Sequence, residues 1–306
     1  MSRNADWIAV DWGTSNVRAW AMEGDRPLET AAAPKGMASL RTDEFEPTLI
    51  ELIGGWLAPG RVTDVVACGM VGARQGWKEA GYASVPGPAF IEGALVRPDV
   101  SDPRIRVHIV HGLSQRQPAD VMRGEETQIA GLLADRPRFT GMVCLPGTHS
   151  KWVQLEAGTV HAFTSFMTGE LFDLLANQSV LHHSVEDDGW SQADFESGVR
   201  AALQAPQSIA SRLFSLRAES LLGDASPGAA RSCLSGLLIG QELAGALSRS
   251  PAGPVVLVGA GRMVALYAAA LALEGVETEQ LAGEKLTLAG LTAVHRSIRR
   301  TDEERS

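Results

Sequence analysis

Short apolar runs alternate with longer amphipathic stretches along this chain. Four runs rich in β-branched residues stop abruptly at an aspartate, a glycine or a proline, and they cover residues 7–10, 65–68, 142–145 and 255–258. Runs of this length, followed at once by turn residues, favour buried strands. Apolar residues at helical spacing predict four helices, over residues 125–135, 231–247, 262–274 and 285–298. Strands that alternate with helices predict an α/β protein.

A stretch with proline and glycine near mid-chain, ADRPRFTG at residues 134–141, is the nearest candidate for a domain boundary. Two of the four predicted strands lie on each side of it, which favours two related halves. The length of 306 residues also favours two domains, at about 100–200 residues each. We therefore expect domains over residues 1–135 and 136–306.

The composition is that of a globular protein, with 45% hydrophobic and 21% charged residues. A net charge of −9 argues against a broad basic face, and so against non-specific nucleic-acid binding. The three cysteines are far apart and form no CxxC pair, which argues against a disulfide framework or a zinc site. We find no signal-peptide core and no apolar stretch near the roughly 20 residues of a membrane helix, so we expect a cytoplasmic protein without membrane contact.

The first chemical motif is the run IAVDWGTSNVRAW, in which two apolar segments flank a small polar turn. This pattern predicts a β-hairpin with Asp11 at the end of its first strand and residues 13–16 in its turn. Small turn residues let backbone N–H groups approach a phosphate, and a neighbouring carboxylate can hold magnesium through water. An ordinary hairpin with a polar tip fits the same residues equally well.

A second run, LPGTHSKWV at residues 145–153, repeats this design in the other half of the chain. A strand enters a turn of small hydroxyl residues, and Lys151 adds a point charge suited to a phosphate or a carboxylate. His149 fits a local hydrogen-bonding role better than a catalytic one. Two such turns predict two phosphate-binding loops that face a common cleft.

A third motif, VGAGRM at residues 258–263, places a tight glycine turn between a strand and a helix. It approaches a dinucleotide fingerprint, but Val264 stands where the third glycine or alanine belongs. We therefore interpret it as a loop that lets a nucleotide base or ribose pass close to the backbone. An oxidoreductase is the alternative, and it leaves both hairpins unexplained.

The fourth motif, RGEET, begins the helix predicted over residues 125–135. Glu125 and Glu126 fit two readings equally: they complement the helix dipole, or one of them is a general base for a substrate hydroxyl. Arg123 beside them is a candidate to pair with a substrate carboxylate.

Together these motifs resemble a known family. A DxGTS hairpin, a second GT hairpin and a late GAG loop, in that order, are similar to the sugar-kinase/actin/heat-shock ATPase superfamily. More closely, the chain resembles the 2-dehydro-3-deoxygalactonokinases through WIAVDWGTSNVRAW, GMVGARQGWKEAGY, VMRGEETQ, LPGTHSKWV, FMTGELF and LSGLLIGQE. These motifs span residues 7–242, and the GAG loop extends the match to about residue 263.

The resemblance implies a fold, a reaction and its cofactors. The fold would be two actin-like, ribonuclease-H-like α/β domains, each with a mixed five-stranded sheet, around a central cleft, with the closing helix after residue 284 as a candidate to pack back on the first domain. The reaction would be ATP-dependent phosphorylation of 2-dehydro-3-deoxy-D-galactonate at its terminal hydroxyl, in galactonate catabolism. ATP and Mg²⁺ would be the cofactors, the small sugar acid would be the substrate, and a homodimer is an open alternative to a monomer.

The family's roles carry over to matching positions. Asp11 resembles the residue that orients magnesium and the transferred phosphoryl group. The ATP-binding positions are those of the first phosphate loop, the second phosphate loop and the adenosine loop: Gly13, Thr14, Ser15, Asn16; Gly147, Thr148, Ser150; Gly259, Ala260, Gly261.

One departure concerns the base, since many sugar kinases have an aspartate where this chain has Glu125 and Glu126. We favour Glu126, with Asp11 as the alternative. The substrate carboxylate needs cations, and the candidates are Arg123, Lys151, and Arg74 or Lys78, while Trp77 and Trp12 are candidate apolar walls.

Two functional alternatives remain open. The first is a kinase for another 2-keto-3-deoxy sugar acid, such as 2-keto-3-deoxygluconate, because sequence does not resolve the stereochemistry that a pocket accepts. The second, more distant, is a non-catalytic sugar sensor.

Overall fold

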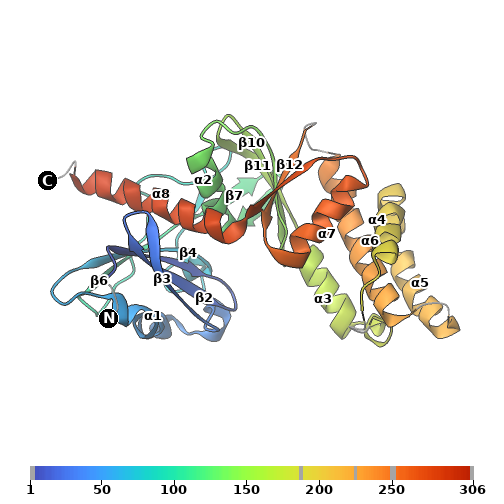
Figure 1. The fold of residues 1–306 in the computed structure, drawn as a ribbon, viewed down its shortest axis with the longest axis horizontal. Helices are drawn as coiled ribbons and strands as arrows, with labels where there is room; N and C mark the ends of the chain where they lie inside the picture. Colours follow the sequence, from blue (N-terminus) through green and yellow to red (C-terminus); the bar gives the residue numbers. More distant parts are fainter. Residues whose placement is uncertain (1–3, 186–188, 224–225, 249–252, 304–306) are drawn as a thin grey trace. The chain divides into compact units, whose positions relative to one another are not determined.

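The structure, a computed structural model, describes residues 4–185, 189–223, 226–248 and 253–303 (Figure 1). Its contacts divide the chain into two compact units. Unit 1 contains Met1–Phe139, Glu156–Ala162 and Gly283–Ser306, and unit 2 contains Thr140–Leu155 and Phe163–Ala282.

Unit 1 is built on a mixed five-stranded sheet. Its spatial order is β3 (Arg26–Ala33), β2 (Val17–Glu23), β1 (Trp7–Trp12), β4 (Thr63–Gly69) and β6 (Ile105–Ile109). The first three strands are antiparallel neighbours, while β1, β4 and β6 run parallel.

Strand β1 is apolar throughout because both faces of its sheet are covered. Ile8, Val10 and Trp12 lie in one core with helix α1 (Phe45–Ile53), whereas Trp7 and Ala9 lie in a second core with helix α8 (Gly283–Glu303). A strand covered on both faces has no polar alternation, which is why its run of apolar residues is continuous.

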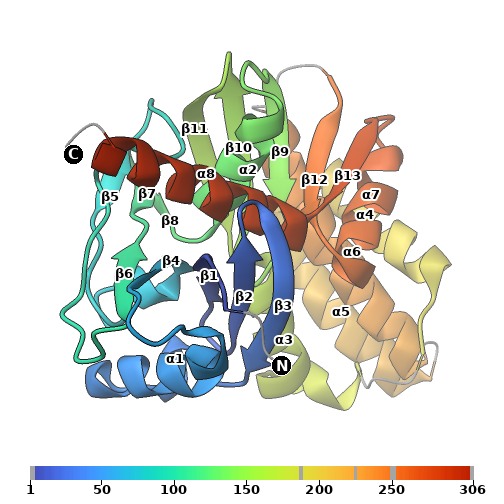
Figure 2. The same ribbon diagram turned by 60° about the vertical axis from the view of Figure 1, so that its left-hand side comes forward.

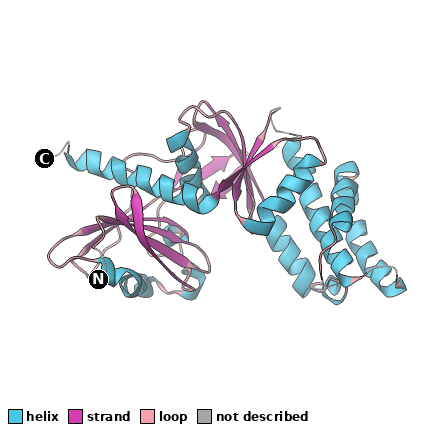
Figure 3. Cartoon of the chain, in the orientation of Figure 1, coloured by secondary structure: helices cyan, strands magenta, loops and turns pink. Residues whose placement is uncertain are grey.

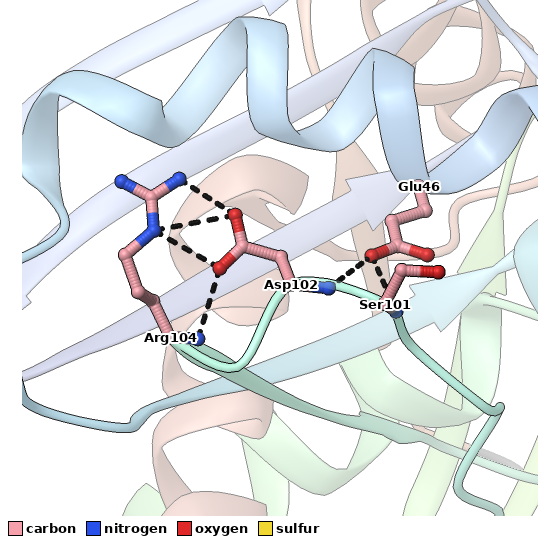
Figure 4. Close-up of polar contacts among 4 residues, drawn as sticks. All are labelled: Glu46, Ser101, Asp102 and Arg104. Atoms are coloured by element: carbon pink, nitrogen blue, oxygen red, sulfur yellow. Dashed lines mark hydrogen bonds and ion pairs between the residues drawn. The ribbon is translucent and has the colours of Figure 1, made fainter.

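In unit 1, the loop just before β6 is fixed by hydrogen bonds to α1 (Figure 4). Glu46 Oε1 accepts the backbone N–H groups of Ser101 and Asp102, each at 2.7 Å. Asp102 in turn pairs with the Arg104 guanidinium at 2.6 Å. The charge of Glu46 therefore holds two consecutive amides of the loop in place.

A small sheet precedes helix α2 (Glu125–Asp135), and sequence patterning does not predict it. Its order is β5 (Tyr82–Ser84), β7 (Gly112–Arg116) and β8 (Ala119–Met122). Strand β8 ends at Met122, three residues before α2 begins, so it sets where the RGEET motif lies.

Helices α2 and α8 of unit 1 cross at very close range (Figure 2). A Cβ added at Gly131 would lie 2.0 Å from the Leu286 carbonyl oxygen, and one at Gly290 would lie 1.9 Å from the Thr127 carbonyl oxygen. Gln128 Nε2 also donates to Thr287 Oγ1 at 3.2 Å. Only glycine permits this crossing, which anchors the start of α2.

A second five-stranded sheet has the same order, and it belongs to unit 2 except for Glu156 and residues 159–162. It runs β11 (Thr159–Phe166), β10 (Ser150–Glu156), β9 (Gly141–Leu145), β12 (Val255–Gly259) and β13 (Thr278–Ala282). As in unit 1, the first strand in sequence is central, pairs antiparallel with the second, and pairs parallel with the fourth. The predicted α/β class with two actin-like, mixed-sheet halves is confirmed.

The remaining helices of unit 2 are α3 (Thr168–Gln178), α4 (Gln192–Gln204), α5 (Ile209–Leu222), α6 (Pro227–Leu247) and α7 (Gly261–Ala272). Helices α4 and α5 pack beside α6 (Figure 3). Helix α6 begins earlier than its apolar pattern predicts, because Ser226 accepts the Ala229 N–H and Pro227 occupies the first turn. Among the described residues, every helix is too short or too polar to cross a membrane.

Candidate functional site

The first predicted phosphate loop is the turn of the β1–β2 hairpin in unit 1. Gly13 N–H donates to the Asn16 carbonyl at 2.9 Å and closes the turn. The exposed N–H groups of residues 14–16 meet no acceptor among the residues that the structure describes. Successive N–H groups without partners are the feature that binds a phosphate.

The loop is held from behind by a segment that the sequence analysis did not single out. Three consecutive N–H groups, of residues 36–38, donate to the carbonyls of residues 13–15 at 3.0 Å each. A Cβ at Gly36 would lie 2.3 Å from the Thr14 carbonyl oxygen, so a larger residue would displace the loop. With its carbonyls engaged on one side, the loop leaves its N–H groups for a ligand.

Asp11 ends the apolar run of β1 and is only partly buried. It faces Arg18 across the hairpin, and Cys68 Sγ lies 3.9 Å from its Oδ1. Burial raises the pKa of Asp11, while the charge of Arg18 opposes that shift. A carboxyl group with a raised pKa that still reaches solvent is able to accept a proton from a hydroxyl group.

Arg18 is a second residue that the motif analysis missed. Its Nη1 lies 2.6 Å from Glu284 Oε2 at the start of α8. The alternation of buried and exposed side chains along β2, combined with the hairpin register, would have placed Arg18 opposite Asp11.

Glu126, the favoured base, is fully buried at the start of α2. Its Oε2 accepts the Gly124 N–H at 2.7 Å, and its Oε1 accepts the Thr127 hydroxyl at 3.1 Å. Burial, with the charge of Glu125 in second place, raises the pKa of Glu126 to about 8. A carboxyl group that is protonated near neutral pH and shielded from solvent is a poor proton acceptor. The geometry therefore favours Asp11, and the base role of Glu126 stays a prediction.

Glu125 is partly exposed, and its Oε2 accepts the Arg123 N–H at 3.1 Å. Both acids thus contact free N–H groups where α2 begins, as the helix-dipole interpretation expects.

Arg123 has a guanidinium with two donors to spare. Its Nη2 donates to the Ala80 carbonyl at 2.5 Å, and the group lies 4.4 Å from the centre of the Tyr82 ring. Its Nε and Nη1 are buried and meet no acceptor in the described part of the chain. Unpaired buried donors are costly, and a carboxylate is the acceptor that a guanidinium pairs with most strongly.

The other predicted substrate contacts of unit 1 divide into exposed and buried residues. Arg74 is exposed, and Lys78 is exposed with Asp99 at 3.8 Å. Trp77 is 8% exposed and lies against Phe45 and Trp12, with ring centres 6.2 and 6.4 Å away. Trp77 thus belongs to the core of unit 1, and its contact with a substrate stays a prediction.

The second predicted loop lies between β9 and β10 of unit 2, and two of its carbonyls are engaged. The Thr148 carbonyl accepts the Glu170 N–H at 3.0 Å, and the His149 carbonyl accepts Lys151 Nζ at 2.9 Å. Gly147, Thr148 and His149 have N–H groups without acceptors among the described residues. The loop again engages its carbonyls and leaves its N–H groups available.

Helix α3 supports this loop as residues 36–38 support the first. A Cβ at Gly169 would lie 2.5 Å from the Gly147 carbonyl oxygen. Glu170 also pairs with His149 through its carboxylate, in agreement with a local role for that histidine. Residues of the FMTGELF motif therefore support the second loop, a role that the sequence alone did not indicate.

Two predicted ligands of this loop are buried. Ser150 is fully buried and bonds to Glu242 and Tyr267. Lys151 is 5% exposed, and its ammonium group is held by the loop itself. Direct contact of either residue with a ligand stays a prediction, because both support the loop from inside.

The GAG loop leads into α7 beside a pocket of about 250 Å³. The pocket lies within unit 2 and combines apolar side chains with two cations. The Arg262 guanidinium lies 4.2 Å from the Trp190 ring centre, and that of Arg231 lies 5.0 Å from the Phe172 ring centre. A mixed apolar and cationic lining suits a flat, phosphate-bearing ligand such as a nucleotide.

Two sheets of one order, each carrying a hairpin loop with free N–H groups, are typical of the actin-like phosphotransferases and ATPases. The family model described as 2-keto-3-deoxy-galactonokinase matches residues 11–294. The chain belongs to that family. The resemblance seen in its motifs is therefore confirmed, as is the predicted class of kinase, and the oxidoreductase and sensor alternatives lose their support.

Known relatives agree over nearly the whole chain. A protein from Rhizobium meliloti (strain 1021), described as a probable 2-dehydro-3-deoxygalactonokinase, is 42% identical over 95% of this chain and 97% of its own. The 2-dehydro-3-deoxygalactonokinase of Escherichia coli (strain K12) is 34% identical over 96% of this chain and 99% of its own. A crystal structure of a candidate 2-dehydro-3-deoxygalactonokinase from Sinorhizobium meliloti superposes with a TM-score of 0.89 at 39% identity, covering 95% of this chain and 99% of that one.

Proposed function

We propose that this chain transfers the γ-phosphoryl group of ATP to the terminal hydroxyl of 2-dehydro-3-deoxy-D-galactonate, forming the 6-phosphate in galactonate catabolism. Family membership supports the reaction and the substrate. The observation that carries the chemistry is the pair of loops whose carbonyls are engaged and whose N–H groups are free. Phosphoryl transfer asks the protein mainly for positioning and charge neutralisation, and such loops supply both.

The residues of unit 1 would prepare the acceptor hydroxyl. Asp11 would remove its proton, because the carboxyl is partly exposed and its pKa is raised. The same carboxylate would hold Mg²⁺ through water, and the ion, when bound, neutralises charge on the phosphates. The N–H groups of residues 14–16 would bind phosphate oxygens.

The residues of unit 2 would bind the nucleotide. The N–H groups of residues 147–149 would bind phosphate oxygens, and the GAG loop with its neighbouring pocket would take the adenosine. On this proposal, residues within the predicted domain 1–135 contact the sugar acid and residues within the predicted domain 136–306 contact adenosine.

The carboxylate of the sugar acid requires a cation. Arg123 is the strongest candidate, since two of its donors lack acceptors among the described residues. Arg74 is exposed and is the second candidate, while Lys151 would act through the second loop. The enzyme would be cytoplasmic, where ATP is available. It would work as a monomer or a homodimer.

The proposed reaction is tested by coupled ADP release with Mg-ATP and either 2-keto-3-deoxygalactonate or its gluconate epimer. Strong preference for the galactonate form is expected. Equal or reversed preference would keep the kinase and change its substrate, whereas no ADP release with either would contradict the proposal. Chelation of Mg²⁺ should abolish turnover, and excess Mg²⁺ should restore it.

The choice of base is tested by comparing Asp11→Asn with Glu126→Gln. We expect Asp11→Asn to lower kcat by about 10²–10⁴-fold, the usual contribution of a general base. Glu126→Gln should retain most of kcat, because that carboxyl is already neutral near pH 7. The opposite ranking would return the base role to Glu126.

A further inference from the structure

A buried carboxylate of unit 2 has no part in the proposed chemistry, yet four side chains converge on it. Glu242 on α6 is 2% exposed. Trp152 Nε1 donates to its Oε1 at 2.7 Å, and the Tyr267 hydroxyl donates to its Oε2 at 2.7 Å. Ser150 Oγ lies 3.1 Å from the same Oε2, and Thr168 donates to it as well.

These donors come from three segments of unit 2 that adjoin the proposed nucleotide contacts. Ser150 directly follows the second phosphate loop. Thr168 begins α3, and the next residue, Gly169, packs against that loop. Tyr267 lies on α7, the helix that starts in the GAG loop. Thr168 and Tyr267 also line the pocket beside that loop.

We propose that Glu242 is the positioning residue of the nucleotide site: its single carboxylate fixes the second phosphate loop, the start of α3 and α7 relative to one another. This inference rests on the proposed function. It explains why α6, which lies outside both predicted phosphate loops, carries the LSGLLIGQE motif. Glu242 is not itself a catalytic residue, because it is buried and its hydrogen-bond partners are protein side chains.

The carboxylate is suited to this role because it only accepts hydrogen bonds. An indole N–H only donates, and hydroxyl groups turn toward whichever acceptor is present. A carboxylate therefore orients all the surrounding donors at once. A glutamine keeps the size and still accepts from Trp152, but its NH₂ group faces the hydroxyls and makes at least one of them turn away.

The test compares wild type with Glu242→Gln in steady-state kinetics and in direct binding of Mg-ADP by calorimetry. We expect KM for ATP and Kd for Mg-ADP to rise together by about tenfold, the effect of losing one hydrogen bond to a charged group. KM for the sugar acid should change less than about twofold, since the strongest candidate for its carboxylate, Arg123, lies in unit 1.

Ser297→Ala is the matched control. Ser297 is also a buried polar residue of a helix, α8 of unit 1, where it donates to the Val294 carbonyl at 2.7 Å. The control should lose stability and leave both KM values unchanged. If Glu242→Gln does not fold, Trp152→Phe replaces it in the test. This variant removes the donor to Oε1 and should also raise Kd for Mg-ADP.

The outcomes separate the inference from the function it rests on. A wild-type protein that neither binds Mg-ADP nor turns over would contradict the proposed function. An active wild type with a Glu242→Gln variant that binds Mg-ADP equally well, or whose two KM values rise equally, would overturn the positioning role.

Discussion

Replacing Glu126 with glutamine tests the electrostatics of the candidate site through stability. Glu126 is fully buried, and its pKa is raised from 4.5 to about 8. The folded chain therefore keeps a proton that the unfolded chain releases above pH 4.5. By linkage, this group makes the protein less stable as pH rises from about 4.5 to 8, and its effect is constant outside that range.

The size of the effect follows from the shift. About 3.5 pKa units at 1.36 kcal/mol each give at most about 5 kcal/mol of stability lost at pH 8 and above. Glutamine does not titrate, and its side-chain oxygen can still accept the hydrogen bond that the Gly124 N–H or the Thr127 hydroxyl donates to Glu126. The stability gain of Glu126→Gln over wild type should thus grow by about 1.4 kcal/mol per pH unit between pH 5 and 8.

Urea unfolding at pH 5, 6.5, 8 and 9, followed by tryptophan fluorescence, measures this difference. Five of the seven tryptophans lie in unit 1, so the signal reports mainly on the unit that contains Glu126. Glu79→Gln is the matched control, because it makes the same substitution at an exposed position of unit 1. A stability difference that stays constant with pH would show that Glu126 is ionised in the fold, and would refute the desolvation argument.

Three further outcomes are expected. His295 is buried against Trp7, with ring centres 4.2 Å apart, and burial lowers its pKa to about 4. The free energy of unfolding of wild type should therefore fall by up to about 3 kcal/mol as pH drops from 6.5 to 4. His295→Gln should not show this loss in thermal melts. Gly36→Ala should destabilise unit 1 by about 1–3 kcal/mol and weaken Mg-ATP binding, while Gly55→Ala, where a Cβ would touch nothing, should do neither. Glu46→Ala should cost about 1–3 kcal/mol in urea unfolding, because it leaves the amides in Figure 4 without their acceptor, and unchanged stability and amide exchange there would contradict this.

The central strands were predictable because both of their faces are buried. The four predicted apolar runs became β1, β4, β9 and β12, the inner parallel strands of the two sheets. Strands at the edges left no such signal: β13 is half exposed, and β5 has three residues. Short edge strands are selected by their neighbours, which a single sequence does not display.

The candidate site shows the same contrast. The hairpin turns were found because small residues cluster there in sequence. The requirement for glycine at residues 36 and 169 was not found, because each glycine contacts a loop about 20 residues away. The burial of Glu126 also escaped prediction, since it depends on how α2 packs in the folded unit, which the residues beside it in sequence do not show.

The place of α8 has a consequence for how the protein is made. Unit 1 starts at the first strand, but its second core is completed only by side chains of α8, which are translated after all of unit 2. The ribosome therefore synthesises all residues of unit 2 before the last segment of unit 1. Until α8 is synthesised, the core that contains Trp7 and Trp20 lacks Leu291, Val294 and Ile298, and transiently exposed apolar surface favours aggregation.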